Sequence, residues 1–327
     1  MRITATLVYK DLTARGIDVQ HVSLGKNSFF IYTYRDKLRT MCGVSTDLSS
    51  FTSKIICDNK GITMTIADKL GIKIPATAVY TNDEAASDFI RKYGTIVVKP
   101  VDGAHGNGVT INVTTVELLD EAISRARRNS ASGGIILQQQ VTGSDFRLLV
   151  IGGEVVAVSE RVAASVMGDG VHTYKELIGI ENDRNVKRGE NYEKALNYID
   201  VEAAQLFLAD RINDIPDEGE VAVVVGTANM GTGGTAINRT GEMPSAMIAQ
   251  AEQIVKEIGA FSCGVDFMYE KDSDEWFLIE LNGSPSFGLH HLPSEGESVN
   301  VTKIFVDKLL NAYDQEALTI NSESDTI

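Results

Sequence analysis

Two apolar segments near the end of the chain, residues 263–268 and 276–281, each contain a single acidic side chain. Both have the length and composition of strands, and a short polar turn, residues 271–275, connects them. Strands joined by so short a turn are antiparallel, so Asp266 on the first is expected to face Glu280 on the second. A carboxylate in apolar surroundings is costly to bury without a cation. The pair therefore requires a fold that brings positive charge or a metal ion to this point.

Asn282 follows Glu280 by two residues and completes a set of oxygen donors. Two carboxylates and an amide oxygen form a hard site that suits Mg²⁺, with Mn²⁺ as the alternative metal, and water and substrate phosphates complete the coordination. The other interpretation of Asp266 and Glu280 is a pair of carboxylates at a sheet edge that reach solvent.

A glycine-rich segment, residues 103–108, comes directly after a strand-like segment that ends in Lys99 and Pro100. Three glycines in these six residues allow backbone N–H groups to approach an anion, and the lysine adds a formal charge. The spacing is neither that of a dinucleotide-binding fingerprint nor that of a P-loop. A segment of this kind is often a plain turn, but the neighbouring lysine favours a phosphate site.

The composition of the 327-residue chain excludes several classes of protein. No apolar run is long enough to cross a membrane, and the N-terminus lacks the apolar core of a signal peptide. The formal net charge of −15 repels nucleic acid and anionic membranes. Three scattered cysteines, Cys42, Cys57 and Cys263, are too few for a disulfide framework or a zinc cluster. We expect a cytoplasmic protein that binds neither nucleic acid nor a membrane.

Predicted helices and strands alternate along the chain, which indicates the α/β (α+β) fold class. We expect a small N-terminal α/β domain at residues 1–57, followed by units at 58–140 and 141–314. A helix over residues 300–313 is predicted to close the fold, and residues 315–327 are expected to form a flexible tail.

Three isolated cations, Lys60, Arg147 and Arg161, and a second glycine-rich loop at residues 228–235 are the remaining chemical features. Each alone is more typical of a surface or structural role. Combined with the first glycine loop, Lys99 and the proposed metal site, they describe a site for ATP. No convincing set of serine or cysteine with histidine indicates a protein nucleophile.

Several segments, in order and at sensible spacing, resemble the ATP-grasp ligases, and specifically the ATP-grasp modules of cyanophycin synthetase and bifunctional glutathione synthetase. The matching segments are residues 58–63, 97–100 with the glycine loop, 141–150, 168–173, 229–234, 264–267, 280–282 and 293–296. The resemblance covers about residues 40–312. It implies an ATP-grasp fold in which residues 58–140 are the central lid subdomain and residues 141–314 the catalytic subdomain.

The resemblance also implies a role for individual residues. Those that contact the nucleotide would be Lys60, Lys99, the lid residues Ala104, His105, Gly106, Asn107 and Gly108, the hinge residues Gln138, Gln139 and Val141, and Asp145 at the ribose. The catalytic cations would be Arg147, Arg161 and Lys99, and the metal ligands Asp266, Glu280 and Asn282. Substrate contacts would come from Asn229, Gly233, Gly234, Ser284 and His290.

The chain departs from the family pattern at three positions. Gln138 stands where these relatives usually carry a glutamate, and Val225 and Gly288 stand where they carry arginines.

The implied reaction joins a carboxylate to an amine. The carboxylate attacks the γ-phosphate of ATP to give ADP and an acyl-phosphate, and the amine then displaces phosphate to leave an amide. We expect small-molecule amino acid or peptide substrates, with a homodimer as the candidate assembly. Two alternatives stay open: a ligase that adds an amino acid to a protein acceptor, and a non-catalytic nucleotide-binding regulator.

Overall fold

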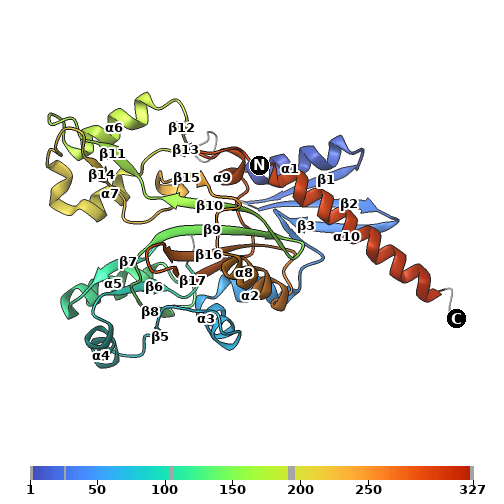
Figure 1. The fold of residues 1–327 in the computed structure, drawn as a ribbon, viewed down its shortest axis with the longest axis horizontal. Helices are drawn as coiled ribbons and strands as arrows, with labels where there is room; N and C mark the ends of the chain where they lie inside the picture. The colour runs from blue at the N-terminus through green and yellow to red at the C-terminus, as the bar shows by residue number, and fades with distance from the viewer. Residues whose placement is uncertain (1–2, 26, 104–105, 191–195, 325–327) are drawn as a thin grey trace.

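A five-stranded antiparallel sheet lies at the centre of the computed structural model, which describes residues 3–25, 27–103, 106–190 and 196–324 (Figure 1). Its strands, in spatial order, are β15 (Thr235–Asn238), β10 (Glu154–Val162), β9 (Ser144–Ile151), β16 (Ser262–Glu270) and β17 (Glu275–Asn282). The predicted pairing is confirmed, because Asp266 lies opposite Glu280 in the β16–β17 register. On its other side Asp266 lies opposite Arg147 of β9.

One face of the central sheet packs into an apolar core. Side chains alternate between the faces of a strand, so Phe146 and Leu148 of β9 point to the same side. With Phe267 they pack into a buried core formed with α2 (Phe51–Asp58), α3 (Lys60–Lys69) and α8 (Ser245–Glu257). Although α3 falls within the range expected for the lid, it packs beneath the central sheet.

The opposite face of the sheet is divided into an apolar end and a polar end. At the apolar end, Leu149 and Ile151 pack against the N-terminal unit. This unit consists of α1 (Ile3–Ala14), the long helix α10 (Val301–Ser324) and the antiparallel sheet of β1 (Val19–Leu24), β2 (Asn27–Tyr34), β3 (Lys37–Cys42) and β4 (Ser45–Thr46). The polar end carries Asp145 and Arg147 and is left open by these elements.

Helix α10 extends well beyond the end expected at residue 313. Glu316 on this helix forms ion pairs with Lys37 and with Arg39, whose Nη2 lies 2.7 Å from Glu316 Oε2. These contacts tie the helix to β3. Residues 315–324 are therefore helical, contrary to the predicted flexible tail, and residues 325–327 lie outside the described residues.

The second sheet belongs to the lid and has the order β5 (Thr77–Val79), β8 (Ile135–Gln139), β6 (Ile96–Pro100) and β7 (Thr110–Val113). Helices α4 (Asp83–Tyr93) and α5 (Val116–Arg128) cover it through their own apolar core. Lys99 and Gln138 lie on its two central strands, β6 and β8. The lid thus presents a lysine toward the polar end of the central sheet.

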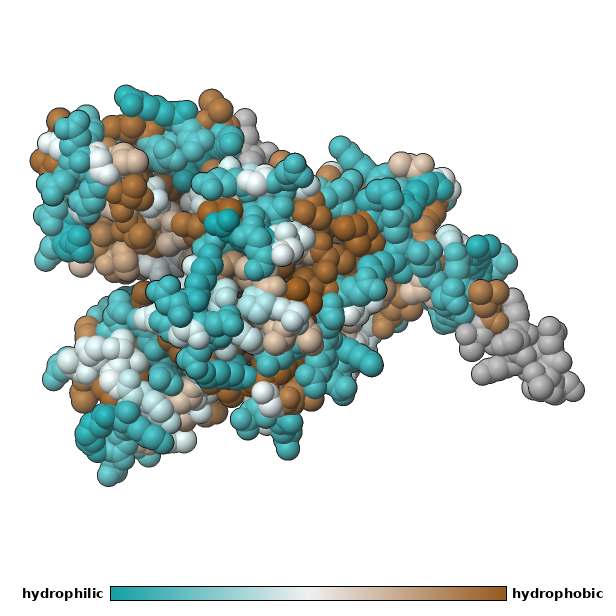
Figure 2. Space-filling model, viewed as in Figure 1, coloured by the Kyte–Doolittle hydropathy of each residue, from teal (hydrophilic) through white to brown (hydrophobic). Residues whose placement is uncertain are grey.

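Residues 164–225 form a small unit with a separate apolar core. It contains β11 (Ser165–Met167), α6 (Tyr174–Arg184), α7 (Val201–Leu208), a short helix at Ala209–Asn213 and β14 (Val221–Val223). The short strands β12 (Arg188–Gly189) and β13 (Leu196–Asn197) connect the small unit to the turn at Met230–Thr232. Helix α9 (Gly288–His291) lies outside this unit, against β10 and β15. Figure 2 shows an indentation between the small unit, at the upper left, and the lid below it.

We predict that Gly168→Ala destabilises the small unit. A Cβ at this position would lie 2.2 Å from the backbone oxygen of Asp217, where the chain is held by a hydrogen bond from Gly168 N to Glu220 O of 2.8 Å. The expected loss is about 1–3 kcal/mol of unfolding free energy. Gly179→Ala in α6 is the matched control, because its Cβ meets nothing within 4 Å. This change should raise stability by about 0.5–1 kcal/mol. Calorimetric melting of both variants is the measurement, and equal effects would contradict the packing described.

Candidate active site

A cavity of about 720 Å³ lies over the polar end of the central sheet. Its wall comes from β9, β10, β16 and β17, from β6 and β8 of the lid, and from loops at residues 226–230 and 284–286. Alternation places Asp145, Arg147, Arg161, Asp266 and Glu280 on this face of the sheet. The cavity therefore holds charged side chains from four adjacent strands.

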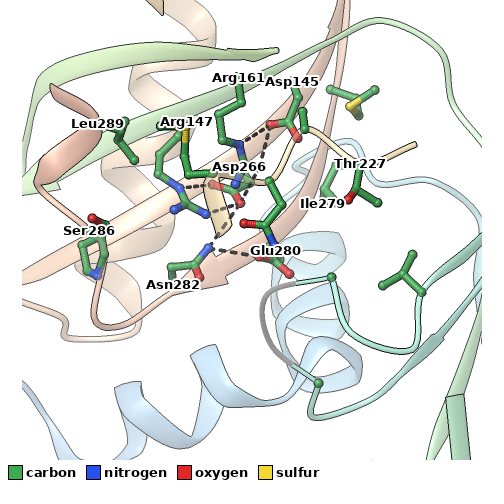
Figure 3. A pocket seen from close by; sticks show the side chains of 18 of the residues that line it. Asp145, Arg147, Arg161, Thr227, Asp266, Ile279, Glu280, Asn282, Ser286 and Leu289 are labelled. Atoms are coloured by element: carbon green, nitrogen blue, oxygen red, sulfur yellow. Dashed lines mark hydrogen bonds and ion pairs between the residues drawn. The ribbon is translucent and has the colours of Figure 1, made fainter. Parts of the chain in front are cut away.

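Asp266 is the most deeply buried charge of the cavity, with 1% of its surface exposed. Arg147 binds it in a bidentate manner, with Nε 2.7 Å from Oδ1 and Nη2 2.7 Å from Oδ2. Arg161 Nη2 donates a further bond of 2.9 Å to Oδ2 (Figure 3). Two guanidinium groups thus compensate one buried carboxylate, which offsets its loss of hydration.

Arg161 also binds Asp145, with its Nη2 2.6 Å from Oδ1. Burial would lower the pKa of Arg161, but the carboxylates of Asp145 and Asp266 raise it above the ordinary value. The pKa of Asp145 is raised, because burial and the charge of Asp266 outweigh the opposing effect of Arg161. Arginines and carboxylates therefore alternate along this part of the cavity.

Glu280 faces the lysines on the other side of the cluster. Burial would raise its pKa, but Lys60, Arg147 and the neighbouring cations lower it to about 2. Lys60 Nζ lies 3.5 Å from Glu280 Oε2, and Asn282 Nδ2 donates to both Asp266 Oδ2 and Glu280 Oε1 at 3.2 Å. Glu280 is therefore a carboxylate at every physiological pH.

Lys99 is buried at the junction of the lid and the central sheet. Its Nζ donates to Gln138 Oε1 at 2.7 Å, and Gln138 Nε2 donates to Thr77 Oγ1 at 2.9 Å. Burial lowers the pKa of Lys99 to about 8, although Glu280 opposes this effect. Gln138, where the resemblance predicts a glutamate, holds the lysine without adding a negative charge.

The oxygen donors partly fit a divalent cation. Within the described ranges no group of three or more His, Cys, Asp and Glu side chains could hold a metal ion. Such an ion would depend on the carboxylates of Asp266 and Glu280 together with the amide of Asn282. Both oxygens of Asp266 already accept bonds from arginines, so Glu280 and Asn282 are the donors with capacity to spare.

The structure brings most of the predicted site residues to the cavity. Those that line it are Lys60, Lys99, Gly106, Asn107, Gln138, Gln139, Val141, Asp145, Arg147, Arg161, Asn229, Asp266, Glu280, Asn282 and Ser284. Ala104 and His105 lie outside the described residues. The individual roles assigned above stay predictions.

Four predicted residues lie away from the cavity wall. Gly108 packs against α5, where a Cβ would lie 2.7 Å from Asn129 Cβ. A Cβ on Gly233 or Gly234 would meet the backbone of Ile199 or Asn229 within 3 Å, so both glycines serve close packing. His290 is buried and lies 3.0 Å from Ser159 Oγ through Nδ1, and burial followed by the charge of Arg147 lowers its pKa to about 3.

Ile279 lines the cavity and Arg188 supports a loop beside it, and neither residue was predicted. Asp266 pairs with Glu280 but Phe267 pairs with Leu278, so Ile279 is the extra residue of a β-bulge and lines the cavity beside Glu280. Arg188 Nη1 donates to the backbone oxygen of Gly233 at 2.9 Å and so fixes the second glycine loop. The sequence gives no local signal for the bulge, and the polar stretch around Arg188 gave no reason to single it out.

Val225 stands where the resemblance predicts an arginine. It is buried in the core of the small unit, where it packs with Val224 and Ala222.

No helix within the described part of the chain is long and apolar enough to span a membrane.

Comparisons with known proteins agree with this geometry. Residues 57–169 match the RimK-like ATP-grasp domain family. The chain is 37% identical over 269 residues to the cyanophycin synthetase of Crocosphaera subtropica, a match that covers 78% of this chain and 30% of the relative. It is 30% identical over 325 residues to the glutathione biosynthesis bifunctional protein GshAB of Listeria monocytogenes serovar 1/2a, covering 95% of this chain and 42% of the relative.

Solved structures support the same assignment. A bifunctional glutathione synthetase from Pasteurella multocida aligns with a TM-score of 0.65 and 28% identity, over 95% of this chain and 43% of that one. The D-alanine–D-alanine ligase of Bacillus anthracis, at 17% identity and a TM-score of 0.50 over 84% of this chain and 72% of that one, supports the fold alone.

The fold is therefore the ATP-grasp fold, as predicted. Residues 57–169 are a RimK-like ATP-grasp domain, and the predicted resemblance to cyanophycin synthetase and bifunctional glutathione synthetase is confirmed. The chain spans less than half the length of these relatives.

We predict that the affinity for an ATP analogue falls as the pH rises through 8. The pKa of Lys99 is lowered to about 8, so the lysine is charged below this pH and neutral above it. If only the charged form holds phosphate well, the dissociation constant should rise by up to about tenfold per pH unit above 8. Calorimetry between pH 7 and 9.5 measures this. Lys99→Arg keeps its charge and should flatten the profile, and an equally steep profile in both proteins would contradict the prediction.

Proposed function

We propose that this chain is an ATP-dependent ligase that joins a carboxylate to an amine through an acyl-phosphate and releases ADP and phosphate. The observation that carries the proposal is the charge arrangement in one cavity. Lys60, Lys99, Arg147 and Arg161 line it together with Asp266 and Glu280. Phosphoryl transfer needs this combination, because it depends on positioning and on neutralising developing charge rather than on a protein nucleophile.

The two lysines would bind the phosphates of the nucleotide. Lys60 Nζ donates to the backbone oxygen of Gly103 at 2.5 Å, so it is held against the start of the glycine loop. Lys99 lies on β6 of the lid, the strand that directly precedes this loop. Gly106 and Asn107 also line the cavity, and their backbone groups can approach the phosphates without steric hindrance.

The two arginines would neutralise the transferred phosphoryl group. A guanidinium has five N–H donors, and Arg147 uses two of them on Asp266. Its remaining donors would contact phosphate or acyl-phosphate oxygens. Because Asp266 fixes both arginines beforehand, little reorganisation is needed in the transition state.

Magnesium is the proposed metal, held by Glu280 and Asn282 with Asp266 beside them. When bound, it would neutralise charge on the triphosphate and so support attack by the carboxylate. Glu280 is ionised, with a pKa of about 2, as a metal ligand must be.

The small-molecule amino acid or peptide substrates follow from the names of the relatives and are part of the proposal.

The proposal is tested by ADP release. The protein is supplied with ATP, Mg²⁺ and the amino acids, singly and in pairs, and mass spectrometry identifies any amide formed. Release of ADP with a stoichiometric amide product supports the proposal. If nucleotide binds but no carboxylate and amine pair stimulates ADP release, the chain is not a ligase.

We predict that Glu280→Gln lowers turnover by at least about a hundredfold. The metal would lose a ligand and would no longer neutralise the charge of the transferred phosphoryl group. The melting temperature should change little, since the amide can still accept the bond from Asn282. Glu275→Gln is the matched control, because Glu275 lies on the same strand but pairs with Lys73 outside the cavity. ADP release by Glu280→Gln equal to that of this control would remove Glu280 from the mechanism.

A further inference from the structure

The cavity has a second end, on the side of Arg147 and Asp266 away from the lid. In Figure 3, Ser286 and Leu289 lie on one side of the charged cluster and Thr227 and Ile279 on the other. We call this end the distal subsite, defined by residues 3–5, 28, 42–43, 284–286 and Leu289. None of these described lining residues carries a formal charge.

Contacts between the N-terminal unit and the segment after β17 hold the distal subsite in shape. Thr4 Oγ1 accepts a bond of 3.0 Å from Phe287 N, and Ser45 Oγ donates to Gly283 O at 2.9 Å. A Cβ on Gly288 would lie 3.2 Å from Ile3 Cγ2, so the two walls are already in close contact. The subsite is therefore formed before any ligand binds.

The charged side chains described beside this subsite, Arg147, Arg161 and Lys54, each form an ion pair. Arg147 and Arg161 are bound to Asp266. Lys54, which acts electrostatically on the Cys42 thiol, forms an ion pair with Asp58 and does not line the cavity. Burial is the main cause that raises the pKa of Cys42, which agrees with a poorly hydrated wall.

We propose that the distal subsite binds a small uncharged, largely apolar group, so that the ligase acts on a neutral amino acid in preference to an acidic or basic one. The inference rests on the proposed function and adds its substrate class. Leu289, Ile3 and Ala5 supply apolar surface, and the neighbouring hydroxyls can satisfy one polar atom. A substrate carboxylate or ammonium placed here would find no opposite charge among the described lining residues, and hydroxyls such as those of Thr4 and Ser286 offset its loss of hydration only in part.

The first test ranks substrates by kcat/KM for ATP-dependent ADP release. Alanine, valine, leucine and methionine are compared with aspartate, glutamate, lysine and arginine, each with a common amine donor set. We expect the best neutral substrate to exceed every charged one by about a hundredfold or more. A charged amino acid as the best substrate would overturn the inference while leaving the ligase function intact.

The second test places a cation in the distal subsite. Cys42→Arg should reduce kcat/KM for the neutral substrates and increase it for aspartate or glutamate, shifting the ratio by about tenfold or more. Thr40→Arg is the control, since it adds the same charge on the same strand at an exposed position outside the cavity. A uniform loss for all substrates, with ATP affinity unchanged, would overturn the assignment of this wall to substrate selection.

Ser28→Arg provides a second variant if Cys42→Arg does not fold, because Ser28 is only partly buried and lines the same subsite. The outcomes separate the two proposals. Absence of ADP release with every amino acid would overturn the proposed function and the inference with it. Release that is greatest with a charged substrate, or a ratio that neither arginine changes, would overturn the inference alone.

Discussion

One buried carboxylate, Asp266, organises the rest of the site. It lies on β16 and is bound by Arg147 from the neighbouring strand β9 and by Arg161 from β10, the strand beyond it. Removing one partner of such a pair commonly costs about 3–5 kcal/mol, because an uncompensated charge stays buried. The positive charge on β10 and β9 thus compensates the negative charge on β16 across three adjacent strands. The two arginines are held in place by the fold itself.

This arrangement explains how a chain with a net charge of −15 can hold a triphosphate. Four cations of the described chain line one cavity, where Arg147 and Arg161 are balanced by Asp266 and Asp145, and Lys60 lies beside Glu280. Lys99 has no carboxylate as a direct partner among the described residues, and its hydrogen bond goes to the neutral Gln138. The lid therefore keeps one lysine whose charge is available to phosphate, whereas no described lining residue of the distal subsite carries a charge.

Much of the site could be predicted from local sequence, because its signals are local. The short turn at residues 271–275 gave the register that places Asp266 opposite Glu280, and strand alternation then put Asn282 on the same face. The bulge at Ile279 could not be predicted, since it depends on pairing with β16. Local sequence could not predict that Gly108 packs against α5 and His290 against Ser159, because both contacts arise from tertiary packing. The distal subsite needs residues 3–5 beside residues 284–289, and no local pattern reports such a contact.

The most direct measurement of the central claim follows the oxygen of the substrate carboxylate. Neutral amino acids labelled with ¹⁸O in the carboxyl group are incubated with the protein, ATP, Mg²⁺ and the amine, and the released phosphate is analysed by mass spectrometry. An acyl-phosphate formed at the arginine cluster leaves one labelled oxygen in the phosphate for each amide made. Amide formation accompanied by an equal amount of phosphate without label would show that the amide does not arise from an acyl-phosphate and would contradict this account.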